Sequence, residues 1–182
     1  YKRQVLVATW VHDYAPAIRG LVLASPAFKV KLYVPLARPA LALWHRLRGL
    51  FFINSYVKGR YLTHDRQRVA SFNNDPLITR AIAVNILLDL YKTSERIVSD
   101  AAAITLPTQL LISGDDYVVH RQPQIDFYQR LRSPLKELHL LPGFYHDTLG
   151  EENRALAFEK MQSFISHLYA CLLYTSPSPR DS

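Results

Sequence analysis

The sequence predicts an α/β fold with a parallel sheet, because strand-like and helix-like segments alternate along most of its 182 residues. Three apolar stretches have the character of strands covered on both faces, at 18–24, 108–113 and 135–141. Helical patterns stand before, between and after them, at 5–14, 123–132 and 153–169. A long segment without strand alternation separates the first two strands. The length suits one domain with a substantial core.

The first two elements are bounded by clear stop signals. A helix is expected over Val5–Tyr14, because Ala15-Pro16 cannot continue it. Ile18–Ala24 then forms a nearly continuous apolar run, which Ser25-Pro26 ends. We therefore expect this run to be a parallel strand that is covered on both faces.

The segment from 29 to 105 is expected to be a mostly helical insertion. It is rich in aromatic residues and arginine, is interrupted by prolines at 35, 39 and 76, and contains helical patterns such as Ala81–Tyr91. The whole net charge lies here, since the stretch from Lys29 to Asp100 holds twelve basic and five acidic residues, a balance of +7. These excess basic residues either lie on an ordinary solvated surface or attract anionic lipid or an anionic substrate.

The C-terminal third returns to regular alternation. A strand over Thr108–Ser113 is entered through a proline, which is tolerated at a strand start. A helix over Pro123–Arg132 and a strand over Leu135–Leu141 follow. The last helix, Asn153–Tyr169, is expected to bury one apolar face, made of Phe158, Met161, Ile165 and Leu168.

Both ends differ from the rest of the chain. Residues 171–182 are rich in Ser and Pro and aperiodic, and resemble a translated sequencing-adaptor tail, as residues 1–4 resemble the matching head. We expect both to be foreign to the fold and the native chain to continue on either side. The expected organisation is a core made of 5–28 and 106–170, an insertion at 29–105, and foreign ends at 1–4 and 171–182.

Several functional classes are disfavoured by the sequence. No run of about 18 apolar residues occurs, which argues against a membrane-spanning helix. No metal-ligand spacing and no Gly-rich phosphate loop is visible, so neither a metal nor a cofactor is expected. No basic cluster accompanies a nucleic-acid reading motif, which disfavours nucleic acid as a partner.

Asp116 and His146 are the candidate catalytic residues. Asp116 follows the strand Thr108–Ser113 and a Gly114-Asp115 turn, and His146 lies in the loop after Leu135–Leu141. An acid on one such loop and a histidine on the next is the second half of the order Ser…Asp…His. The serine itself is missing, because no Gly-x-Ser-x-Gly motif occurs in the sequence.

From Val5 to about residue 170 the chain resembles the C-terminal half of an α/β-hydrolase of the monoglyceride lipase and lysophospholipase-like group (serine aminopeptidase S33 type). Four stretches carry the resemblance: GLVLASP at 20–26, LTHD at 62–65 with NDPL at 74–77, LPTQLLISGDDYVV at 106–119, and GFYH at 143–146 followed by Glu151. The resemblance implies a partial α/β-hydrolase fold with the last three strands of its parallel sheet. It implies that the insertion is a cap.

The resemblance also implies roles for the candidate residues. His146 would be the base of a Ser-His-Asp triad, and Asp116, three residues past Ser113 and followed by Tyr117-Val118-Val119, would be its acid in preference to Asp115. We expect the missing nucleophile a few residues before Val5, so that the chain alone is inactive. Two other readings stay open: a relative with an aspartate nucleophile, such as an epoxide hydrolase or dehalogenase, and a non-catalytic lipid-binding relative.

The composition of the insertion favours a lipid-like ester as substrate. Leucines and aromatic residues between 36 and 52 supply a large apolar surface, interleaved with Arg38, Arg46 and Arg48. Such a cap suits an acyl chain, and its basic face suits peripheral contact with anionic lipid, although the aromatics equally suit packing against the core. We expect a cytoplasmic protein, and the resemblance to some bacterial fusions allows a downstream domain in the full-length protein.

Overall fold

The computed structural model describes residues 2–32, 36–55 and 57–175. Three parallel strands form the main sheet, in the order β1 (Leu21–Ala24), β4 (Thr108–Ser113) and β5 (Lys136–Leu141). Ala24 pairs with Leu111, and Ser113 pairs with Leu141. Because the strands are parallel, their carboxyl ends lie along one edge of the sheet. The predicted α/β class, the three strands and the parallel sheet are confirmed.

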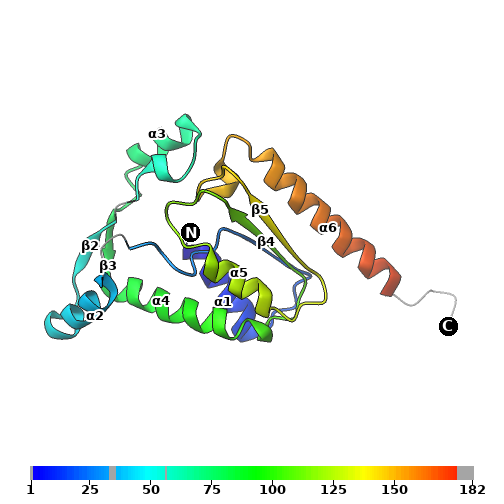
Figure 1. Cartoon of the computed structure of the whole chain (residues 1–182), viewed down its shortest axis with the longest axis horizontal. Helices are drawn as coiled ribbons and strands as arrows, with labels where there is room; N and C mark the ends of the chain where they lie inside the picture. The colour runs from blue at the N-terminus through cyan, green and yellow to red at the C-terminus, as the bar shows by residue number, and fades with distance from the viewer. Residues whose placement is uncertain (1, 33–35, 56, 176–182) are drawn as a thin grey trace.

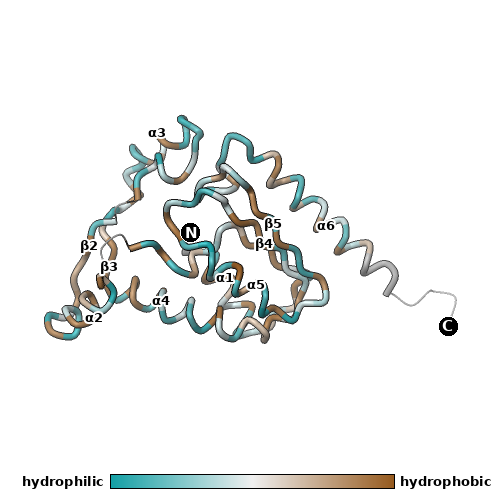
Figure 2. Tube along the Cα trace, in the orientation of Figure 1, coloured by the Kyte–Doolittle hydropathy of each residue, from teal (hydrophilic) through white to brown (hydrophobic). Residues whose placement is uncertain are grey.

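Helices cover both faces of this sheet (Figure 1). On one face lie α1 (Lys2–Tyr14), α4 (Val84–Ser99) and α5 (Gln122–Arg130), and on the other lies α6 (Ala155–Thr175). The first face holds the larger core, with fully buried side chains from α1, β1, β4, α4 and α5, among them Val5, Leu23, Ile97, Leu110 and Phe127. Figure 2 shows an apolar stretch along β4, which is buried at all six positions, as expected of a strand covered on both faces, whereas β5 at the edge of the sheet is mostly half-buried.

The buried face of α6 differs from the predicted one. Ala157, Phe164 and Leu168 are buried, and Met161 packs against the smaller core cluster. Phe158 and Ile165, which the sequence assigned to this face, are 43% and 42% exposed. The prediction was wrong for these two because α6 has apolar residues on two neighbouring stripes, and the stripe that contains the small Ala157 packs against the sheet.

The segment between β1 and β4 is largely helical but also contains two short strands. Its elements are α2 (Ala37–Arg48), β2 (Phe52–Asn54), α3 (Arg66–Asn74), β3 (Ala81–Ala83) and α4. The antiparallel pairing of β2 with β3 was not predicted, because three residues are too few to display alternation. For the same reason the helix expected from Ala81 begins at Val84.

The two ends assigned to adaptor sequence are partly helical. The first helix includes residues 2–4, and α6 continues to Thr175. The remainder of both segments, residue 1 and residues 176–182, lies outside the described residues. The domain boundaries deduced from the sequence stay a prediction. Within the part of the chain that the structure describes, none of the helices has the length and apolar character needed to cross a bilayer.

Candidate functional site

Asp116 is held at the carboxyl edge of the sheet by the turn after β4. Its Oδ1 accepts hydrogen bonds from the backbone N–H groups of Val118 at 2.7 Å and Val119 at 2.9 Å. Gly114 allows the turn to approach the next loop, since a Cβ there would lie 2.9 Å from the carbonyl oxygen of Leu141. The carboxylate is thereby fixed in one orientation, with Oδ2 directed away from its own loop.

His146 lies in the loop after β5 and meets this second oxygen. Its Nδ1 is 2.7 Å from Asp116 Oδ2, and the two residues are only 6% and 7% exposed. The structure therefore brings together the two residues selected from the sequence, which are 30 positions apart in the chain. Asp115, the alternative acid, is exposed.

The hydrogen bond selects the tautomer of the imidazole. A carboxylate only accepts, so Nδ1 carries the proton that lies between the two groups. In a neutral ring, Nε2 on the opposite side is then the acceptor. This arrangement suits a general base whose orientation is set by an acid.

A cluster of buried hydroxyl groups joins the histidine loop to the ends of β1 and β4. Thr148 Oγ1 lies 2.9 Å from Ser25 Oγ and 2.9 Å from Ser113 Oγ, at the ends of β1 and β4. Ser25 Oγ also accepts the backbone N–H of Ser113 at 3.0 Å. Thr148 was not predicted from the sequence, although its position two residues after His146 was a usable signal.

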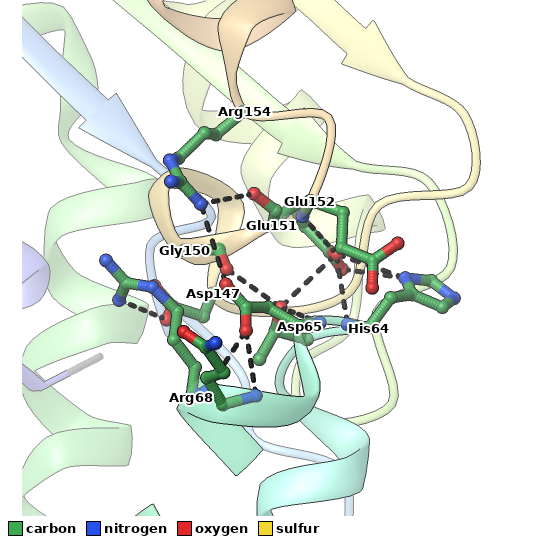
Figure 3. Close-up of polar contacts among 10 residues, drawn as sticks. His64, Asp65, Arg68, Asp147, Gly150, Glu151, Glu152 and Arg154 are labelled. Atoms are coloured by element: carbon green, nitrogen blue, oxygen red, sulfur yellow. Dashed lines mark hydrogen bonds and ion pairs between the residues drawn. The ribbon is translucent and has the colours of Figure 1, made fainter. Parts of the chain in front are cut away.

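On the opposite side, the buried Glu151 binds the loop and the segment around His64 (Figure 3). Its carboxylate accepts the backbone N–H groups of Tyr145 at 2.8 Å and His64 at 3.0 Å, and lies 3.1 Å from His64 Nδ1. Burial raises the pKa of Glu151, but the hydrogen bonds from His64 and Tyr145 lower it by a larger amount. The pKa of this carboxyl group therefore lies below its ordinary value.

The neighbouring Asp65 points elsewhere, as expected for adjacent residues. It caps α3 by accepting the N–H groups of Gln67 and Arg68, and its other oxygen lies 3.6 Å from Arg154 (Figure 3). His64 and Asp65 therefore do not form a pair of their own. Among the residues described, no group of three or more His, Cys, Asp or Glu side chains is arranged to hold a metal.

A large apolar cavity opens beside the acid. It has a volume of about 1020 Å³ and is lined mainly by α2, β2 and their neighbours, including Leu41, Trp44, Phe51, Tyr61 and Tyr117. Tyr117 directly follows Asp116 in the chain, and its ring packs edge-on against Tyr145, which directly precedes His146, with centroids 5.0 Å apart. The cavity and the Asp116–His146 pair are thus joined by two neighbouring rings.

A smaller hollow of about 250 Å³ lies directly against His146. It is lined by Gln4 near the start of α1, by Ala24 at the end of β1, and by Thr148 and Leu149 of the histidine loop, among others. The amino-terminal end of α1 therefore faces the imidazole.

The fold and this site define an α/β-hydrolase. Residues 5–153 match the family model described as serine aminopeptidase, S33, and the chain belongs to this family.

Two relatives match most of this chain. The chain is 97% identical over 166 residues to the Escherichia coli K12 protein YnbC, covering 91% of this chain and 28% of that protein. It is 26% identical over 161 residues to the phospholipase YtpA of Bacillus subtilis, covering 85% of this chain and 61% of that protein. The chain thus spans less than two thirds of the length of these relatives.

Solved structures support the fold. The monoacylglycerol lipase of Paleococcus ferrophilus superposes with a TM-score of 0.79 at 18% identity, over 90% of this chain and 65% of that one. A monoglyceride lipase of Saccharomyces cerevisiae, solved with a substrate analogue, gives 0.74 at 14% identity, over 96% and 60%. Both superpositions show that the chain has an α/β-hydrolase fold.

Proposed function

We propose that this chain supplies the acid and the base of a carboxylic ester hydrolase that acts on lipid-like acyl esters. The observation that carries the proposal is the buried 2.7 Å contact between His146 Nδ1 and Asp116 Oδ2 at the carboxyl edge of a parallel sheet. A burial of this kind is costly for an ionisable pair unless the two groups satisfy each other. Acyl transfer is a chemistry that uses such a pair.

The proposed mechanism uses both nitrogens of His146. Nε2 accepts the proton of a serine hydroxyl as the serine oxygen attacks the ester carbonyl, and then donates that proton to the leaving alcohol. Water attacks the acyl-enzyme in the same manner and releases the fatty acid. Throughout, Asp116 holds Nδ1–H in place and stabilises the imidazolium that forms in each step.

The serine is proposed to precede residue 5. Gln4 and His146 line the same hollow, which supports a nucleophile close to the start of the matched segment. The hydroxyl groups of Ser25, Ser113 and Thr148 are engaged with one another, which makes them poor candidates for a nucleophile within the chain.

The acyl chain of the substrate is proposed to occupy the cavity between α2 and Tyr117. Its volume of about 1020 Å³ and its apolar lining match a long acyl group. The name of one relative, the phospholipase YtpA, supports a lipid ester as the substrate. The outer surface of α2 exposes Leu43 and Leu47 beside Arg46 and Arg48, and we propose that it contacts anionic lipid.

Hydrolysis of p-nitrophenyl esters of increasing chain length tests the proposal. We expect no turnover by this chain, and turnover by the E. coli relative that is lost when the aligned His146 is replaced by alanine. Turnover by this chain that disappears in His146→Ala would instead place the nucleophile within it. A relative that hydrolyses epoxides or haloalkanes but not esters would indicate an aspartate nucleophile.

A further inference from the structure

We infer that Glu151 is a positioning residue for His146, because it clamps the loop that carries the imidazole to the segment Leu62–Asp65; this inference rests on the proposed role of His146 as the base. The two segments are far apart in the chain, since His64 and Glu151 are separated by 87 positions. The clamp lies outside the Asp116–His146 pair itself.

Both neighbours of His146 are fixed by this clamp. The N–H of Tyr145 donates to Glu151 Oε1 at 2.8 Å, and the N–H of Asp147 donates to the carbonyl oxygen of Leu62 at 2.8 Å. One bond therefore goes to Glu151 directly, and the other goes to a segment that Glu151 holds. The backbone on each side of the imidazole depends on the same carboxylate.

Glu151 holds the Leu62–Asp65 segment through several contacts. The backbone N–H of His64 donates to Oε2 at 3.0 Å, and the His64 ring lies 3.1 Å from both oxygens. Thr63 Oγ1 donates to the carbonyl oxygen of Gly150 at 2.8 Å, one residue before the glutamate. The His64 ring also packs on Tyr145, with centroids 3.8 Å apart.

The burial of Glu151 shows that these contacts are not incidental. Its side chain is 3% exposed, whereas that of its partner His64 is 44% exposed. A carboxylate removed from water needs such donors to compensate its lost hydration. Figure 3 shows Glu151 facing His64, and two ion pairs lie nearby: Arg68 of α3 with Asp147, and Arg154 with Asp65.

A positioning role makes a different prediction from a purely structural one. Replacing Glu151 should disturb the hydrogen bond between His146 and Asp116, although neither residue is changed. In contrast, a glutamate that only stabilises the fold would lower the melting temperature and leave the imidazole as it is. The adjacent Glu152 is exposed and is the matched control.

Nuclear magnetic resonance on this chain is the direct test, with variants Glu151→Gln, His64→Ala and Glu152→Gln. We expect Glu151→Gln to accelerate amide exchange of Tyr145 and His64 about tenfold or more and to broaden or shift the proton signal of His146 Nδ1. His64→Ala, which keeps Glu151, should give a smaller change in the same signals. Glu152→Gln should match the unmodified chain.

The same substitutions in the E. coli relative give the catalytic readout. We expect the change at the position of Glu151 to lower kcat about 10- to 100-fold while KM stays within about twofold, since substrate binding is untouched. An unchanged His146 signal in a folded Glu151→Gln chain would overturn the inference. A relative with no esterase activity would refute the proposed function alone, because the resonance test does not depend on turnover.

Discussion

Replacing Asp116 by asparagine tests the acid–base pair most specifically, because the structure predicts how the new side chain will orient. Oδ1 accepts two backbone N–H groups, from Val118 and Val119, at 2.7 and 2.9 Å. The amide oxygen of an asparagine must keep that position, since an NH₂ group there would face two donors. The NH₂ group is then directed at His146 Nδ1, which becomes an acceptor, and the ring proton moves to Nε2.

The consequence is a histidine in the wrong tautomer for a general base. A loss of this kind lowers kcat by about 10⁴-fold in a serine-dependent triad, or about 5 kcal/mol of barrier. Because both bonds to Oδ1 are kept, the fold should survive. The unfolding free energy should fall by no more than about 1.5–3 kcal/mol, the contribution of one hydrogen bond to a charged group.

Two assays follow this substitution. On this chain, nitrogen resonances of the His146 ring should report protonation at Nδ1 before the change and at Nε2 after it. On the E. coli relative, ester turnover should fall by the factor above, while the aligned Asp115→Asn, which alters an exposed neighbour, should leave turnover unchanged. Turnover within tenfold of the unmodified protein would remove Asp116 from the mechanism.

Three further outcomes are expected. Gly114→Ala should lower the unfolding free energy by about 1–3 kcal/mol in urea titrations, because its Cβ would lie 2.9 Å from the backbone carbonyl oxygen of Leu141 and 2.9 Å from Pro142 Cα; an unchanged midpoint would contradict this close approach. The pKa of Glu151 is lower in the folded chain than its ordinary value. The stabilisation from this carboxylate is therefore complete above its ordinary pKa and disappears as pH falls through the folded pKa. Glu151→Gln should therefore flatten the acid limb of a stability-against-pH curve, and an equally steep limb would refute the assignment. Leu47→Glu should reduce co-sedimentation with vesicles containing anionic phosphatidylglycerol, and unchanged binding would exclude α2 as the contact.

The parts of the fold that the sequence predicts well are those fixed by burial on both sides. The strand β4 is buried at all six positions, and its apolar run in the sequence correctly predicted both its first and its last residue. The face of α6 was predicted only in part, because Phe158 and Ile165 satisfy the helical period as well as the buried stripe does. Periodicity identifies a helix but does not choose between two apolar faces.

The candidate pair was predictable, whereas its supports were not. Asp116 and His146 each follow a parallel strand, and parallel strands place such loops at one edge. The contacts of Glu151 with His64 join segments 87 positions apart, and no local pattern indicates that pairing. Likewise, the hydroxyl cluster of Ser25, Ser113 and Thr148 forms because β1 and β4 are neighbours in the sheet and the histidine loop passes their ends. Only the folded chain defines this arrangement.

Labelling of the E. coli relative with a fluorophosphonate probe, followed by peptide mapping, distinguishes a serine nucleophile served by His146 from every alternative. We expect one labelled serine in the sequence that precedes the aligned segment, and loss of that label when the position of His146 carries alanine. Label on a serine within the aligned segment, or label that persists without the histidine, would contradict this expectation.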